Sequence, residues 1–342
     1  MTKQRLNWLD SLKGFTVICV VIGHIMAGFR NSGMFDEFSG ITYGLYNTLY
    51  AFHMPLFFAV NGYAFGMAFT SGTLRSSTLR QDALRNKCLN MVIIYIFYSL
   101  VMHVLRIIFP SFVINRLEPL RLLLLWVRPI PVYWYVYVLV IYYLLFGINR
   151  IRNASPWLMS GLLAGISVLS ALLPGIPWLR LNDAMFNIPF FYFGYCLQKE
   201  SDTRSVKYAG WAICGVTAIL AVFFWRSGTF LRNIPMVGTV VATGCVFAIF
   251  TAFRKISLLN QSQLLIYCGH HRLEVYLLHT YVLSACRAFL PWIGIRNYFI
   301  HTLISSLAGL LLPMLVGYVA EKLNLRAWLL KPYTKWLERK KD

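Results

Sequence analysis

Apolar runs recur along the whole chain, and each is about as long as an α-helix must be to cross the hydrocarbon core of a bilayer. Lipid offers no partners to backbone N–H and C=O groups, so such runs fold as helices, whose backbone bonds are internal. We therefore expect an all-α polytopic membrane protein with about ten transmembrane helices. The predicted ranges are 12–29, 44–69, 89–109, 133–148, 156–174, 185–198, 208–225, 235–253, 273–290 and 298–320.

The composition agrees with this class. Hydrophobic residues make up 58% of the chain and charged residues only 13%, whereas soluble domains carry about 25% charged residues. We find no linker or soluble appendage, so we predict one membrane-embedded domain over residues 1–342. The first apolar run lacks a small-residue cleavage site and is expected to remain as a helix. Residues 118–127 are predicted to add an interfacial or re-entrant helix.

The net charge of +20 is explained by basic residues at the ends of the apolar runs. Segments on the N-terminal side of the membrane hold roughly twice as many Lys and Arg residues as the opposite segments, so both termini are predicted to be cytoplasmic. This distribution favours a multi-pass membrane protein over a nucleic-acid-binding protein, and no nucleic-acid partner is expected.

Motifs of several other protein classes are missing. The seven cysteines occur singly and no CxxC or His/Cys cluster is present, so neither a disulfide framework nor a metal site is expected. There is also no Walker loop, dinucleotide fingerprint, GxSxG elbow or HExxH motif.

The first apolar run joins charged residues to a histidine predicted to lie inside the bilayer. Eleven helical steps from Lys13 to His24 make three turns plus roughly 20°, so both share a face about 16 Å apart along the axis, and Asp10 joins that face. An imidazole can serve as a general base near neutral pH. The alternative for His24 is a neutral imidazole that bonds to another helix.

The second run contains His53, Pro55 and Asn61. Pro55 removes a backbone donor and frees the carbonyl of Ala51, which opens the helix beside His53. One interpretation is a kinked, polar-lined substrate wall that includes His53 and Asn61. The other is helix–helix contact through Asn61 with a close-packing Gly62.

Arg85 and Lys87 precede the third run. These cations are candidates for phosphate contacts, but a plain positive-inside flank also explains them.

Tyr135 begins the fourth run, where it either belongs to an interfacial aromatic belt or lines a sugar site. In the ninth run His279 shares a face with Tyr276, while Glu274 is turned about 140° away from His279. Glu274 is expected to pair with Arg272 or with a cation from another helix. His270 and His271 are expected to be solvated.

Four motifs in order resemble the membrane acyltransferase 3 family, and especially its fucose 4-O-acetylase-like group. They are Leu-Asp-x-Leu-Lys-Gly with Gly-His at residues 9–24, Phe-His-Met-Pro-Leu-Phe-Phe with Asn-Gly-Tyr at 52–63, the Phe-Gly-Tyr segment at 187–195, and Tyr-Leu-Leu-His at 276–279.

The resemblance implies a ten-helix O-acyltransferase of a bacterial inner membrane. Such an enzyme transfers an acyl group, commonly acetyl from cytoplasmic acetyl-CoA, to a hydroxyl of a glycan or lipid-linked sugar. By position, His24 is the implied catalytic base, with Asp10 assigned beside it, and Lys13 the CoA-phosphate contact. Arg85 and Lys87 match the family's basic cluster. Lys87-x-x-Asn90 stands where many members have Arg-x-x-Arg, and this departure weakens the case for phosphate binding there.

The remaining polar residues are assigned to the acceptor or the oxyanion, without a ranking among them: His53, Asn61, Tyr135, Glu274 and His279. The partners implied are the saccharide acceptor and membrane lipid, and a homo-oligomer is compatible.

Three other hypotheses stay open at this stage. Transfer could proceed through an acyl-histidine at His24. The chain could instead be a transporter or flippase for lipid-linked sugars, or a scaffold in a glycan-export complex.

Overall fold

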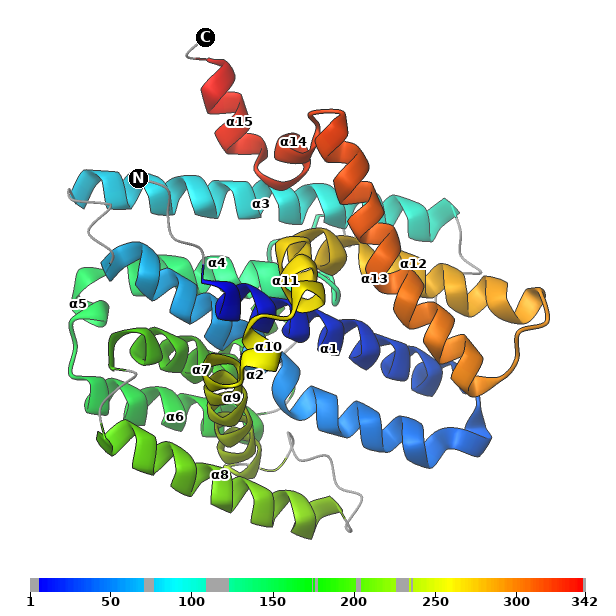
Figure 1. Cartoon of the computed structure of the whole chain (residues 1–342). Helices are drawn as coiled ribbons and strands as arrows, with labels where there is room; N and C mark the ends of the chain where they lie inside the picture. Colours follow the sequence, from blue (N-terminus) through cyan, green and yellow to red (C-terminus); the bar gives the residue numbers. More distant parts are fainter. Residues whose placement is uncertain are drawn as a thin grey trace. The chain divides into compact units, whose positions relative to one another are not determined.

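The computed structural model describes residues 6–70, 77–108, 123–173, 175, 178–200, 204–225, 234 and 236–340, and within these ranges it contains helices and no strand (Figure 1). The longer helices are α1 (Asn7–Ser32), α2 (Ser39–Thr70), α3 (Ser77–Ile108), α4 (Trp134–Gly147), α6 (Pro156–Leu172), α7 (Leu181–Glu200), α8 (Arg204–Trp225), α9 (Val237–Lys255), α12 (Arg272–Trp292) and α13 (Tyr298–Lys322). Shorter helices are η1 (Asp36–Phe38), α5 (Asn149–Arg152), η4 (Trp178–Arg180), α10 (Ser257–Asn260), α11 (Gln263–His270), α14 (Arg326–Leu330) and α15 (Pro332–Arg339).

Every predicted apolar run contains a helix, so the all-α prediction is confirmed. Most helices extend beyond the predicted ranges, because polar end turns continue the helical backbone past the apolar stretch. The predicted interfacial helix at 118–127 lies partly outside the described residues, and its described part, 123–127, forms turns.

Four helices are long and apolar enough to cross a membrane among the residues described: Asn7–Ser32, Thr78–Ile108, Val237–Lys255 and Tyr298–Lys322. Others are short for this purpose. At 1.5 Å per residue, the 14 residues of α4 cover about 21 Å of a core about 30 Å thick. The count of about ten spans and the cytoplasmic position of both termini stay predictions.

The chain forms two compact units. Unit 1 comprises Met1–Thr16, Asn47–Leu84 and Ile141–Gly269, and unit 2 comprises Val17–Tyr46, Arg85–Val140 and His270–Asp342. The prediction of a single domain stays a prediction.

Unit 1 is held together by close backbone contacts at glycines. A Cβ on Gly62 of α2 would lie 1.8 Å from the Phe191 carbonyl oxygen of α7, and a Cβ on Gly194 would lie 1.9 Å from that of Ala59. Lipid gives helices little hydrophobic reason to associate, so small residues that let backbones approach are the main source of packing energy. Gly62 is therefore a close-packing residue, as one interpretation of the sequence expected.

The first turns of α1 pack on α11 in the same manner. A Cβ on Gly14 would lie 1.9 Å from the Leu265 carbonyl oxygen, and one on Gly269 would lie 1.9 Å from that of Asp10. Beside these contacts, α1, α2, α7 and α9 form the apolar core of unit 1. Its buried residues are Leu9, Leu12, Leu56, Ala59, Val60, Tyr63, Leu197, Val246, Phe247, Phe250 and Phe253.

Unit 2 contains the rest of α1 with α12, α13 and most of α3. The Asn297 side chain caps α13 by accepting hydrogen bonds from the N–H groups of Phe299 and Ile300, at 3.0 and 3.1 Å. A Cβ on Gly309 of α13 would lie 3.0 Å from both Val21 and Leu283. These contacts bring α1, α12 and α13 together and position the polar side chains described below.

We predict that Gly194→Ala destabilises the protein by about 1–3 kcal/mol, because the added methyl group collides with backbone that must move. Gly161→Ala in α6 is the matched control, since nothing lies within 4 Å of the added Cβ, and alanine favours a helix. Thermal unfolding of the purified full-length chain in detergent measures both. Equal stability of the two variants would contradict the close contact.

Candidate functional site

Two histidines from helices far apart in sequence meet in unit 2. The ring centroids of His24 on α1 and His279 on α12 are 5.0 Å apart, with the ring planes inclined by 56°. His279 is fully buried, whereas His24 is half-buried. The pair therefore brings a fully buried histidine against one that is largely enclosed.

Hydrogen bonding fixes the orientation of His279. Its Nδ1 lies 2.9 Å from the carbonyl oxygens of both Val275 and Tyr276. Carbonyl oxygens only accept, so Nδ1 carries the proton and donates. In the neutral ring Nε2 is then an acceptor, and this buried atom has no hydrogen-bond partner among the described residues. His279 thus presents an unused lone pair in a ring beside His24.

A tyrosine packs against His279, and a second tyrosine packs against the first. The Tyr276 ring lies 6.2 Å from that of His279 and 5.4 Å from that of Tyr135, which is buried. The Tyr276 hydroxyl donates to the Val132 carbonyl oxygen at 2.9 Å. Tyr135 is therefore part of a packed aromatic group, rather than the exposed interfacial belt that was one interpretation of the sequence.

A second tyrosine group extends this one toward α3. The Tyr133 hydroxyl donates to the Leu277 carbonyl oxygen at 3.0 Å and lies 2.9 Å from the Tyr281 hydroxyl. The Tyr281 hydroxyl donates to the Tyr98 carbonyl oxygen at 3.2 Å. These bonds tie α12 to the start of α4 and to α3, and so support the helix that bears His279.

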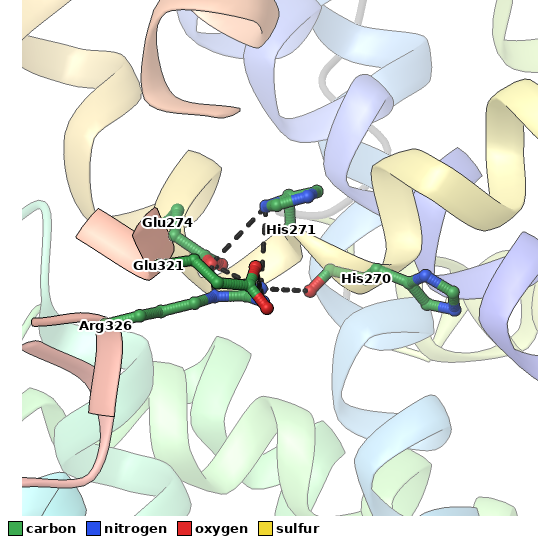
Figure 2. Close-up of polar contacts among 5 residues, drawn as sticks. All are labelled: His270, His271, Glu274, Glu321 and Arg326. Carbon is green, nitrogen blue, oxygen red and sulfur yellow. Dashed lines mark hydrogen bonds and ion pairs between the residues drawn. The ribbon is translucent and has the colours of Figure 1, made fainter. Parts of the chain in front are cut away.

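Glu274 belongs to an ion-pair cluster with Arg326 of α14 (Figure 2). Its Oε1 accepts from Arg326 Nε at 2.7 Å and lies 2.6 Å from Nη2. Arg326 also pairs with Glu321 at 3.0 Å and donates to the His270 carbonyl oxygen at 3.3 Å. This is the expected pairing with a cation from another helix, and it connects α12 to α14.

His271 corrects one expectation. It was predicted to be solvated, but it is buried, and its Nδ1 lies 3.5 Å from Glu274 Oε1. Gly317 of α13 leaves room for both side chains, because a Cβ there would lie 3.0 Å from Glu274 Oε1 and 3.1 Å from His271 Nδ1. A polar side chain at a predicted helix boundary was taken as solvated, whereas α13 and α14 cover it.

Asp10 and Lys13 form an ion pair on α1 within unit 1. Lys13 Nζ donates to Asp10 Oδ1 at 2.7 Å, and the side chains are only 13% and 10% exposed. The spacing of three residues on one helix face explains the pair. Asp10 thus compensates the charge of Lys13.

Arg85 and Lys87 are exposed on α3. Two helical residues two positions apart point about 200° away from each other, so these cations do not share a face.

Asn90, the position where the family resemblance led us to expect Arg, has a different role. Its Oδ1 accepts from the N–H groups of Tyr333 and Thr334, at 3.0 and 3.3 Å, and its Nδ2 donates to Thr334 Oγ1 at 2.7 Å. Asn90 therefore caps the first turn of α15, whose N–H groups lack partners within the helix.

His53 and Asn61 lie on α2 in unit 1, so the structure does not assign them to the group around His279. His53 is buried with Nδ1 2.6 Å from the Leu49 carbonyl oxygen. Asn61 donates to the Phe57 carbonyl oxygen at 3.0 Å. Both bonds are formed within α2.

Sequence reasoning missed three polar residues of unit 2. His103 and His301 are buried in α3 and α13, and both could have been found by the rule that singled out His24. His301 Nε2 is buried without a partner among the described residues. Arg287 of α12 lies against α1, because a Cβ on Gly28 would be 2.9 Å from its Nη1. Nothing in the sequence pairs Arg287 with Gly28.

We predict that Arg326→Gln destabilises the protein by about 3 kcal/mol, because it leaves the buried Glu274 carboxylate without its cation. The matched control is Lys335→Gln, which removes an exposed pair with Glu338 and is expected to cost under about 1 kcal/mol. Thermal unfolding in detergent compares them. If Arg326→Gln were as mild as the control, the cluster would not anchor α14.

Comparison with known proteins bears on this arrangement. A family model described as an acyltransferase domain, that of the acyltransferase 3 family, matches residues 6–319. The chain is 25% identical over 237 residues to "Nodulation protein NolL" of Sinorhizobium fredii, covering 66% of this chain and 58% of that protein. It is 22% identical over 240 residues to "Nodulation protein NolL" of Mesorhizobium japonicum, covering 68% of this chain and 60% of that protein.

The matched regions thus span about three fifths of these relatives. No solved structure matches the chain. The family match extends over nearly the whole sequence and includes all four of the motifs in which the resemblance was found. The chain belongs to the acyltransferase 3 family.

Proposed function

We propose that this protein is an integral membrane O-acyltransferase that transfers an acyl group, most simply acetyl, from cytoplasmic acyl-CoA to a hydroxyl of a glycan or lipid-linked sugar. The family supports the acyltransferase class. The donor, the acceptor and a location in a bacterial inner membrane are parts of the proposal.

One observation carries the proposal: the contact between His24 and His279. The His24 imidazole lies beside the buried His279 imidazole, whose proton is held on Nδ1. General-base catalysis needs a group that can accept a proton and a neighbour that fixes its orientation. We assign His24 as the base and His279 as its positioning residue.

In the proposed reaction His24 takes the proton of the acceptor hydroxyl while its oxygen attacks the thioester carbonyl. The C–O bond of the ester forms, the C–S bond breaks, and the protonated His24 returns the proton to the CoA thiolate. Holding both substrates near the imidazole supplies much of the acceleration. We propose that the Tyr135–Tyr276 pair next to His279 contacts the acceptor or stabilises the oxyanion.

The donor contacts are less uniform than the family resemblance suggested. Lys13 is already paired with Asp10, so we assign Asp10 to positioning Lys13. A CoA phosphate bound to Lys13 would share the ammonium group with the Asp10 carboxylate. Arg85 and Lys87 are exposed and lie on different faces of α3. We propose that one of these two cations contacts the 3′-phosphate of CoA, because both are accessible and both match the family's basic cluster.

Glu274, His53 and Asn61 receive supporting roles in this proposal. The Glu274–Arg326 pair orients the start of α12, which bears His279. His53 and Asn61 shape α2 near Pro55.

We predict that His24→Ala lowers the rate of acetyl transfer by about 10²–10⁴-fold, the usual contribution of a general base. His279→Ala should lower kcat by up to about 10²-fold through misplacement of His24, with KM for acetyl-CoA unchanged. His279→Asn, which can still donate to the two carbonyl oxygens, should recover part of this loss. Release of CoA thiol by purified protein measures each rate.

Cys19→Ala controls for packing, since it truncates a buried side chain on the same helix. Normal transfer by His24→Ala would refute the assignment. Labelled acetyl trapped on the protein without acceptor would instead favour the acyl-histidine route.

We predict that the wild-type protein prefers acetyl-CoA over acetyl-3′-dephospho-CoA. Arg85→Gln or Lys87→Gln should lower the ratio of kcat/KM for acetyl-CoA to kcat/KM for the dephospho donor at least tenfold. Arg106→Gln, at the other end of α3, is the control and should keep it. Ratios of kcat/KM for the two donors give the result. If both variants kept the preference, the 3′-phosphate would bind elsewhere.

A transporter or flippase remains the rival from another class. Passage of a lipid-linked sugar through reconstituted protein without acyl-CoA, together with no ester formation, would support the rival and contradict the proposal.

A further inference from the structure

A pocket of about 420 Å³ opens at the corner between α1 and α2, and all its lining residues belong to unit 2. The size is within the range of small-molecule sites. We call it the corner pocket. Its lining residues are Phe29, Arg30, Met34, Phe35, Asp36, Ser39, Gly40, Thr42 and Tyr43. Its lining residues on α1, Phe29 and Arg30, belong to the last turn of that helix.

Arg30 is held in place without using its hydrogen-bond donors. Its guanidinium lies 5.5 Å from the ring centroid of Tyr43 and 4.9 Å from that of Tyr46. Within the described part of the chain it forms no hydrogen bond or ion pair. Cation–π contact with two aromatic rings favours this position of the guanidinium, and the exposed Arg30 keeps its N–H groups available to a ligand.

Asp36 lies at the same pocket and forms no ion pair with any described residue. A carboxylate accepts hydrogen bonds and cannot donate them. The pocket therefore offers an oriented donor fork and an unused acceptor, with the Ser39 hydroxyl as a further polar group.

The apolar wall of the corner pocket is an aromatic cluster. Phe35 has a positive φ of 61°, which is unfavourable for a residue with a side chain. In this conformation its ring packs 5.0 Å from Phe29, 5.6 Å from Tyr298 and 5.4 Å from His301. The Tyr298 hydroxyl accepts a hydrogen bond from Thr42, another lining residue, at 3.2 Å. Helix α13 thus supports the pocket from behind.

This combination selects the chemistry of the ligand. A sugar has hydroxyls that both donate and accept, and a C–H face that packs on apolar side chains. A phosphate headgroup would satisfy Arg30 but would be repelled by the Asp36 carboxylate. A purely apolar ligand would leave Arg30 and Asp36 without hydrogen-bond partners. A neutral saccharide can bond to both of these side chains and pack on the aromatic wall.

We propose that the corner pocket binds a neutral saccharide, as a recognition subsite for the acceptor. This inference rests on the proposed function and adds to it the residues that select the acceptor, namely Arg30 and Asp36.

The test measures binding without any acyl donor. The full-length chain in phosphatidylcholine nanodiscs is titrated with methyl glycosides of glucose, galactose and fucose, and saturation-transfer NMR reports the bound sugar. We expect at least one glycoside to bind, and Arg30→Met and Asp36→Asn to weaken it about tenfold or more. Met retains an apolar stem at position 30, and Asn retains the shape of Asp36.

Two controls match these variants. Lys322→Met removes a cation that also stacks on a tyrosine, 5.6 Å from the ring of Tyr318, and Glu37→Gln removes the carboxylate next to Asp36 outside the pocket lining. Both should bind the glycoside as the wild type does. No binding of any glycoside, or equal binding by all variants, would overturn the proposal.

A repeat in phosphatidylglycerol nanodiscs separates sugar from lipid. If Arg30→Met altered only the retention of anionic lipid and left glycoside binding intact, the pocket would be a headgroup site and the proposal would be wrong. Glycoside binding that depends on Arg30 and Asp36, in a protein that transfers no acetyl group, would support the pocket and contradict only the proposed function.

Discussion

The structure depends on how apolar helices attract one another when lipid surrounds them. Burial of apolar surface gives little reason for such helices to associate, so the energy must come from close packing and from polar bonds between helices. In unit 1 Gly62 and Gly194 let two backbones meet. In unit 2 Gly309 brings α13 against Val21 and Leu283. The histidine pair exists only because α1 and α12 approach this closely.

The same surroundings make each polar group informative. A buried donor or acceptor without a partner is costly, so most are paired, as Glu274 is with Arg326 and Asn90 is with the start of α15. His279 Nε2 and His301 Nε2 are among the buried side-chain atoms for which the described residues supply no hydrogen-bond partner. The His279 ring lies beside the proposed base, and the His301 ring packs on Phe35 of the corner pocket.

Much of the fold could be predicted from the sequence, because a run of about 20 apolar residues has few alternatives to a helix. The pairings between helices could not. Polarity inside apolar runs singled out His24 and His279, but their contact depends on packing between residues 255 positions apart. Glu274 was expected to meet a cation, and only the fold identifies Arg326. His301 was overlooked because it lies within an apolar run, and Arg30 was overlooked because it directly follows one.

The claim that unites these observations is that the protein moves an acyl group from CoA to a sugar hydroxyl. Purified protein in sealed vesicles, given acetyl-CoA with a labelled acetyl group and a saccharide acceptor, tests it directly. We expect labelled O-acetyl ester on the saccharide in a one-to-one ratio with the CoA thiol released. Thiol release without ester, or sugar crossing the vesicle membrane with no acetyl-CoA present and no ester formed, would contradict it.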